Sequence, residues 1–175
     1  MGSINEQRID NLCILEGFVP KVVYILTKML LEHFRSGIQA SRLFQCKLSA
    51  EGEVKQRRQI RRDFLKAIRL AIDESREYQD RLFQSLRECP WMPSLIKMVL
   101  DEIAVTFDEG DLYKAIITDY YLIEENLTNE EIAEQLGLST SSLERKKREA
   151  IKCFGICMYR YAYRREEEDK EKLND

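Results

Sequence analysis

The sequence predicts an all-α fold. Of its 175 residues only 7 are Gly and 3 are Pro, whereas 44% are hydrophobic and 34% are charged. Few helix breakers among many helix-forming residues favour helices over a sandwich or a barrel. No stretch of useful length alternates between apolar and polar residues as a half-buried strand would. The apolar fraction suffices for a buried core, which excludes a chain disordered throughout.

The first half of the chain predicts a helical bundle. Pro20 suits the first turn of a helix whose apolar face continues to Ser36-Gly37, where we expect a stop or break. Ser49 is expected to cap a long amphipathic helix that runs to Arg87, with a break near Ser75 as the alternative.

The segment 89–93, Cys-Pro-Trp-Met-Pro, must interrupt this helical pattern, because two prolines so close together cannot continue a helix. We interpret Trp91 as a packing anchor. Ser94 is expected to cap a helix that runs to about Phe107, and the turn Asp108–Asp111 leads into another helix.

Residues 127–151 carry the most informative pattern. Thr128 and Glu131 have the spacing of a capping box, which starts a short helix. That helix must end at Gly137, where a left-handed backbone is readily accessible. Ser139 or Thr140 then caps a second helix, whose buried side carries Leu143, Ala150 and Ile151.

Two helices joined by a short turn that contains Gly are typical of a helix-turn-helix. Such a motif needs a small residue where the two helices cross, and Ala133 occupies that position. A bulkier side chain there would force the helices apart.

The segment Leu127–Ser139, Leu-Thr-Asn-Glu-Glu-Ile-Ala-Glu-Gln-Leu-Gly-Leu-Ser, resembles the region 4 helix-turn-helix of bacterial sigma factors. The pattern of that family is close to Leu-Thr-x-Glu-Glu-Ile-Ala-Glu-x-Leu-Gly-x-Ser. The sequence is even more similar to phage-encoded late-gene and autolysin-type transcription regulators, which carry such a motif after a variable helical segment. The resemblance spans residues 111–154 and implies sequence-specific DNA binding at bacterial or phage promoters.

One position departs from the sigma-factor pattern. An apolar residue usually stands where this chain has Lys146. We therefore expect the second helix to be more basic and less well packed at that position, as in the phage regulators.

In a motif of this kind the start of the second helix enters the major groove, and flanking groups hold phosphates. Short or polar side chains reach base edges, while basic ones bind bases or phosphates. The predicted DNA-binding residues are Thr140, Ser141, Ser142, Glu144, Arg145, Lys147, Arg148 and Lys152. Among these, Arg145 is expected on a base or phosphate, and Arg148 and Lys152 on phosphates. The alternative is that 145–148 form a solvated helix face.

The net charge of −3 conceals a segmented distribution. Residues 94–135 hold 11 acidic and 2 basic side chains, whereas 139–165 hold 8 basic and 2 acidic ones. Residues 166–175 are acidic again, and we expect them to be a disordered tail that can shield the basic helix. An overall negative charge thus does not exclude DNA.

Two further clusters have competing interpretations. Tyrosines and arginines alternate over 154–165, where they either stack on single-stranded bases or, as we favour, pack within the domain. A second basic cluster contains Lys55, Arg57, Arg58, Arg61 and Arg62. It contacts DNA backbone or, in the favoured interpretation, is a charged helix face balanced by Glu51, Glu53 and Asp63.

Enzyme chemistry is not predicted. The only histidine, His33, lies on a helix flank, and no phosphate-binding loop or common nucleophile motif occurs. The cysteines Cys13, Cys46, Cys89, Cys153 and Cys157 lack metal-type spacing, so we expect buried reduced thiols and neither metal nor cofactor. No apolar run is long enough for a bilayer, and a cytoplasmic protein is expected.

The sequence therefore predicts three parts. Residues 1–108 form a helical region for dimerisation or partner binding, 109–165 a sigma region 4-like DNA-binding domain, and 166–175 the acidic tail. The expected partners are double-stranded DNA, RNA polymerase and a second copy of the chain. One alternative is a sigma-like factor, which would need a region 2 helix that is not visible. The other is a protein-interaction module whose helix-turn-helix binds RNA polymerase or an anti-sigma-type partner rather than DNA, an alternative that the acidic segment 94–135 favours because it can dock on a basic surface.

Overall fold

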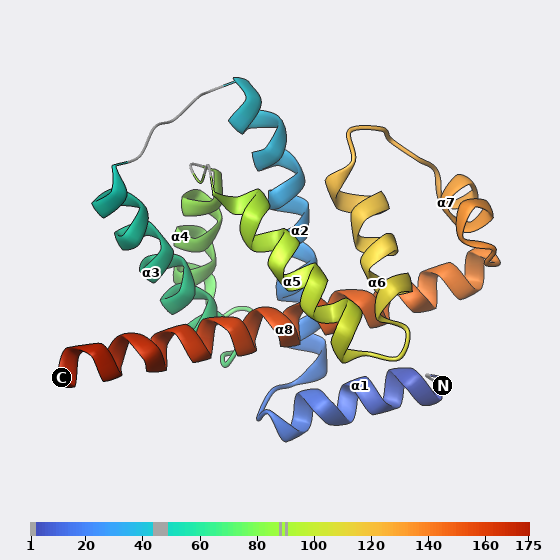
Figure 1. The fold of residues 1–175 in the computed structure, drawn as a ribbon. Helices are drawn as coiled ribbons and strands as arrows, with labels where there is room; N and C mark the ends of the chain where they lie inside the picture. The colour runs from blue at the N-terminus through green and yellow to red at the C-terminus, as the bar shows by residue number, and fades with distance from the viewer. Residues whose placement is uncertain (1–2, 44–48, 88, 90) are drawn as a thin grey trace.

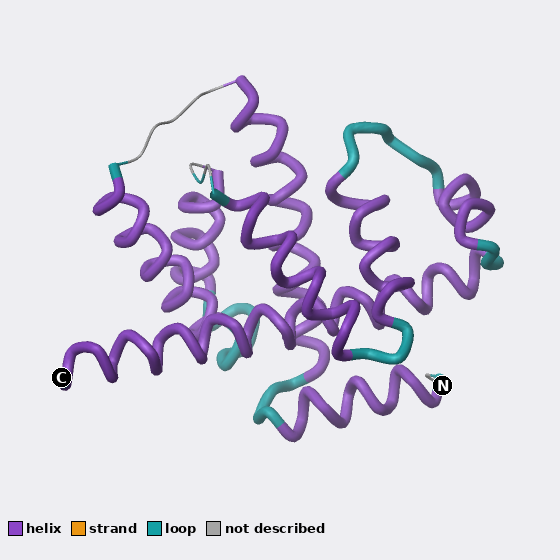
Figure 2. Tube along the Cα trace, in the orientation of Figure 1, coloured by secondary structure: helices purple, strands orange, loops and turns teal. Residues whose placement is uncertain are grey.

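A computed structural model describes residues 3–43, 49–87, 89 and 91–175, and all regular structure in these residues is helical (Figures 1 and 2). The all-α prediction is confirmed for this part of the chain. The elements are α1 (Ile4–Leu15), α2 (Pro20–Leu43), α3 (Ala50–Ala67), α4 (Arg76–Arg87), α5 (Met92–Thr106), α6 (Gly110–Ile117), a π-helical turn η1 (Thr118–Leu122), α7 (Asn129–Leu136) and α8 (Thr140–Asn174).

The long helix α8 organises the fold. It starts beside α7 and crosses the molecule to the C-terminus, packing against α1, α2, α3, α5, α6 and α7 (Figure 1). Its middle, residues 149–159, is buried on all sides. The helix that begins at the predicted motif is therefore also the central helix of the core, and it continues without interruption past residue 165.

The crossing of α2 and α8 explains a glycine in the middle of a helix. A Cβ at Gly155 would meet the hydroxyl of Thr27 and come within 2.9 Å of a methyl carbon of Val23. Close by, Phe34 and Phe154 meet edge to face, with ring centroids 6.3 Å apart. The two helices can approach this closely because residue 155 has no side chain.

The helix predicted from Ser49 to Arg87 is instead two helices. Ser49 caps α3 as expected, but α3 ends at Ala67, and α4 begins at Arg76 and packs beside it. Asp63 on α3 is 1% exposed and accepts hydrogen bonds from Gln59 (2.8 Å) and from Arg81 on α4 (3.2 Å). The break near Ser75 was the correct alternative, because folding back lets the apolar stripes of both halves share one core.

Two other predicted helix boundaries were wrong. Helix α2 does not stop at Ser36-Gly37 and continues to Leu43. Helix α5 starts at Met92, ahead of Ser94, and has no side-chain cap. Pro93 lies in its first turn, where a missing N–H costs nothing. The helical pattern is interrupted as predicted, but only between Arg87 and Met92, because Met92 and Pro93 already belong to α5. The anchoring role of Trp91 is confirmed, since Trp91 is 8% exposed and its Nε1 donates to Gln56 Oε1 at 3.0 Å.

The acidic segment 166–175 is not a disordered tail, because α8 extends through it to Asn174. Glu166 pairs with Arg61 at 3.2 Å, and Asp169 pairs with Arg61 at 2.7 Å and with Arg58 at 3.3 Å. The second basic cluster is therefore a charged helix face, as favoured, but much of its balance comes from α8. Glu51, Glu53 and Asp63 were expected to balance this cluster, and of these three Glu53 pairs with Arg57.

None of the described helices combines the length and apolar character that crossing a membrane requires.

Candidate nucleic-acid interface

The start of the predicted helix-turn-helix, at Thr128, has the hydrogen bonds that the sequence predicts. Thr128 Oγ1 accepts a hydrogen bond from the Glu131 amide at 3.2 Å, and Glu131 Oε2 accepts one from the Thr128 amide at 2.7 Å. These bonds form the predicted capping box at the start of α7. The hydrogen bond from the Thr128 backbone also holds the pKa of Glu131 below its ordinary value.

The turn between α7 and α8 is also as predicted. Gly137 has φ 66° and ψ 32°, the left-handed conformation that ends α7. Ser139, of the two candidate caps, accepts a hydrogen bond from the Ser142 amide at 3.2 Å and starts α8. Ala133, the small residue of the predicted motif, is buried on α7 with 4% of its surface exposed. We call residues 128–152 the α7–α8 corner.

The start of α8 presents polar groups to solvent. Thr140 and Ser141 are exposed, and Ser142 is half-buried. Glu144 Oε1 accepts a hydrogen bond from Asn129 Nδ2 at 3.2 Å, which ties the first turns of α8 to the start of α7. The predicted residues 140–144 are thus brought together at one accessible end of α8.

A stripe continues from this end along α8. Ser141, Arg145, Arg148 and Lys152 are spaced by four, three and four residues, so they share one helix face. Arg145 is half-buried, and its Nε is buried without a hydrogen-bond partner in the described part of the chain. Unlike Lys146, Arg148 and Lys152, Arg145 forms no ion pair with any described residue. Its guanidinium is therefore not held by a carboxylate of the described residues.

The other predicted cations of the corner already have partners. Lys147 Nζ lies 3.8 Å from the centre of the Tyr120 ring, and burial lowers its pKa. Arg148 Nε lies 3.4 Å from Glu6 on α1, and Lys152 Nζ lies 2.6 Å from Asp10. The side chain of Lys152 is only 9% exposed, so this conformation does not present it to a phosphate as predicted.

The environment of Lys146 differs from the one predicted from the sequence. It is buried between Glu109 and Glu149, with its Nζ 3.0 Å from a Glu149 oxygen. Glu149 is fully buried and accepts further hydrogen bonds from Tyr113 (2.8 Å) and Ser3 (2.7 Å). Burial works against the charge of Lys146, but the hydrogen bonds to Glu109 and Glu149 outweigh it and raise the lysine pKa.

The expectation that position 146 is loosely packed and adds to a basic surface was therefore wrong. Its charge is neutralised inside the protein, where a lysine between two carboxylates replaces an apolar side chain. One of the two partners, Glu149, is three residues away and is visible in the sequence as an i,i+3 pair. The other, Glu109, is distant in the sequence and gives no such signal.

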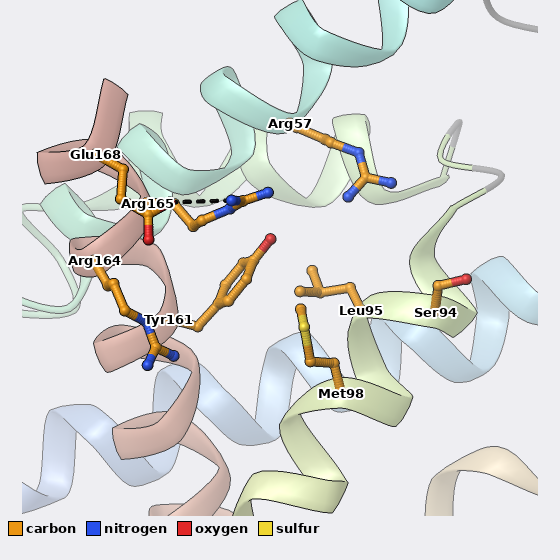
Figure 3. A pocket seen from close by; sticks show the side chains of 8 residues that line it. All are labelled: Arg57, Ser94, Leu95, Met98, Tyr161, Arg164, Arg165 and Glu168. Atoms are coloured by element: carbon orange, nitrogen blue, oxygen red, sulfur yellow. Dashed lines mark hydrogen bonds and ion pairs between the residues drawn. The ribbon is translucent and has the colours of Figure 1, made fainter. Parts of the chain in front are cut away.

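Beyond the corner, the tyrosines of α8 mainly pack inward. Tyr159 and Tyr161 are each 7% exposed, and Phe18 meets Tyr159 edge to face at 4.5 Å. Tyr161 lines a pocket between α3, α5 and α8, where Arg165 pairs with Glu168 at 3.1 Å (Figure 3). This arrangement agrees with the packing interpretation of residues 154–163.

The cysteines in the described residues, Cys13, Cys89, Cys153 and Cys157, are buried free thiols, and Cys46 lies outside these residues. Burial raises the pKa of Cys13 to about 11 and that of Cys89 to about 12. Within the described ranges, no three His, Cys, Asp or Glu side chains lie close enough together to hold a metal ion.

Comparison with known proteins adds no relative: no protein family, curated protein or solved structure matches the chain.

Proposed function

We propose that the protein is a DNA-binding transcription regulator that reads double-stranded DNA with a helix-turn-helix of the sigma region 4 type, formed by the α7–α8 corner. The observation that supports DNA binding most strongly is the accessible end of α8, where hydroxyl side chains lie on the same face as Arg145. Hydroxyls and an arginine without a carboxylate partner are groups that contact base edges and phosphates. In this proposal, Thr140, Ser141, Ser142, Glu144 and Arg145 enter the major groove.

The ion pairs of the α7–α8 corner limit its affinity for DNA of any sequence. Lys146, Arg148 and Lys152 are paired with carboxylates. Arg145 and Lys147, whose partner is the Tyr120 ring, are the cations of the corner that no described carboxylate neutralises and that can meet phosphates. Each neutralised phosphate contributes a slope of about −0.9 to the dependence of log affinity on log salt. We therefore expect a slope of about −2 for binding in this conformation.

The remaining parts of the proposal follow from the resemblance of residues 111–154. The protein acts at bacterial or phage promoters in the cytoplasm, with RNA polymerase and a second copy of the chain as candidate partners for the N-terminal helices. The proposal contains no catalytic step and no cofactor.

A second candidate function is a protein-interaction module that binds RNA polymerase rather than DNA. The exposed side of α7 supports this candidate, since Glu130, Glu131 and Glu134 are all exposed there. Carboxylates beside the groove-binding end of α8 repel phosphates but suit a basic protein surface.

A titration of labelled duplex DNA by fluorescence anisotropy over a salt series distinguishes the two. DNA binding must weaken with salt, and selection from a random duplex library must then yield a common sequence. Absence of binding at low salt, together with capture by purified RNA polymerase, would establish the interaction module instead. Transcription by core polymerase with this chain alone would identify a sigma-like factor.

A further inference from the structure

Helix α1 places acidic side chains along the basic face of α8. Asp10 Oδ1 lies 2.6 Å from Lys152 Nζ, and Glu6 Oε1 lies 3.6 Å from the same nitrogen and 3.4 Å from Arg148 Nε. At the end of α1, Glu16 pairs with Arg160 at 3.0 Å. Three basic residues of α8 are thus neutralised by one segment close to the N-terminus.

The same helix is weakly anchored by apolar contacts. Among its residues, only Ile9 and Cys13 are buried apolar side chains. Ile4, Ile14 and Leu15 are 72%, 59% and 83% exposed. The polar contacts with α8 and with Glu109 therefore supply much of what holds α1 in place, and these contacts weaken when a competing anion arrives.

Polar contacts also join the start of α1 to the buried cluster around Lys146. Ser3 donates to Glu149 at 2.7 Å, and Asn5 donates to Glu109 at 2.7 Å. The position of α1 is thereby coupled to the carboxylates that neutralise Lys146.

The position of α1 matters because Arg148 and Lys152 continue the stripe that begins with Ser141 and Arg145. In the first half of the stripe Ser141 is exposed and Arg145 is half-buried, whereas α1 lies along α8 at the second half (Figure 1). Carboxylate oxygens at Arg148 and Lys152 occupy the positions that phosphate oxygens would take on a duplex following this face.

We infer that Arg148 and Lys152 form a second phosphate-binding surface that α1 covers, and that duplex DNA must displace the carboxylates of α1 to reach it. The inference rests on the proposed function and extends it: α1 is an intramolecular competitor of the DNA backbone. The shielding that the sequence suggested for the acidic segment 166–175 is performed by α1, since Glu166 and Asp169 are paired with α3 instead.

The test removes the negative charges of Glu6 and Asp10 in the 175-residue chain. In the variant Glu6→Gln/Asp10→Asn, the ammonium of Lys152 loses both carboxylates. The control Glu74→Gln/Asp80→Asn makes the same change in net charge at two exposed positions outside α8. Binding of a fluorescein-labelled duplex of mixed sequence is measured over a salt series for both variants and the wild type.

We expect the α1 variant to bind the duplex several-fold more tightly than the control, because the DNA no longer has to displace two carboxylates to reach Arg148 and Lys152. Equal affinities of the two variants at every salt concentration, with DNA binding by the wild type intact, would overturn the masking of Arg148 and Lys152 alone. No binding by any of the three proteins would overturn the proposed function as well. DNA binding by the α1 variant, with none by the wild type or the control, would support both the masking by α1 and the proposed function.

Hydrogen exchange of the wild-type protein provides a measurement that does not depend on the variant folding. Saturating duplex DNA is expected to accelerate exchange of the α1 amides (Ile4–Leu15) several-fold while those of α4 stay unchanged. Unchanged or slower exchange in α1 at saturation would contradict its displacement.

Discussion

Lys146 Nζ lies 3.0 Å from Glu149 Oε2, and this ion pair connects the start of α8 to the buried centre of the molecule. Glu149 is fully buried, and Lys146 is 8% exposed. Both charges are therefore kept away from water and depend on each other and on a small number of polar neighbours.

Removing one partner of this pair should destabilise the protein strongly. Lys146→Met leaves the Glu149 carboxylate buried with hydrogen bonds from Tyr113 and Ser3 but no cation, at a cost of about 3 kcal/mol in the free energy of unfolding. The double variant Lys146→Met/Glu149→Gln should lose less than the two single variants added together. Urea unfolding measures all three, with exposed Lys170→Met as a control expected to change stability by about 0.5 kcal/mol or less. Strict additivity would show that the pair is not coupled.

Arg145→Ala should weaken binding to a selected DNA sequence by about 1–3 kcal/mol and relax the preference at one base position. Arg145→Lys should recover part of the affinity, because it keeps the charge but loses the planar fork. Competition binding with single-base variants of the selected duplex measures both effects. The control Arg76→Ala removes an exposed arginine from α4. If Arg145→Ala matched this control at every salt concentration, Arg145 would not contact DNA.

Gly155→Ala should destabilise the protein, although alanine is about 1 kcal/mol better than glycine in an ordinary helix interior. The added methyl group meets Thr27 and Val23, and overpacking of this kind costs about 1–3 kcal/mol. The second variant Thr27→Ala removes the hydroxyl nearest to the new methyl and should restore part of the loss. Thermal unfolding followed by circular dichroism tests this, and a stabilised Gly155→Ala would show that α2 and α8 are not so closely packed.

Glu109 should make stability depend on pH in the acidic range. Burial disfavours its charge, but hydrogen bonds from Lys146 and Asn5 hold the pKa below the ordinary value of 4.5. A lowered folded-state pKa contributes stability that is present above 4.5 and lost as the pH falls through the folded-state value. Glu109→Gln should therefore flatten this part of the curve of unfolding free energy against pH. Glu134→Gln, an exposed change on α7, is the control and should keep the wild-type slope.

The details of the α7–α8 corner were predictable because its signals are local. A Thr with a Glu three residues later, a Gly after the last apolar residue and a Ser before the next helix each satisfy backbone groups within a few residues. The same kind of reasoning placed Pro20 at the start of α2. It was misleading at Gly37, because the cost of one glycine inside a helix is small beside the burial of a long apolar stripe.

Contacts between segments that are distant in the sequence could not be predicted from sequence patterns. The helical period is unbroken from Ser49 to Arg87, and no Gly or Pro marks the turn after Ala67. The pairing of Glu166 with Arg61 likewise joins residues whose separation in the sequence gives no hint of a contact.

The sequence alone determined that the chain is helical and where the α7–α8 corner begins, turns and continues, since these depend on composition and on hydrogen bonds between near neighbours. Only the tertiary structure decided which cations of the corner are accessible. Arg145, Lys146, Arg148 and Lys152 are equivalent as a run of charge, but carboxylates from α1, α8 and the start of α6 neutralise three of them. The availability of a charged side chain depends on its distance from the opposite charge, and that distance is set by how the helices pack.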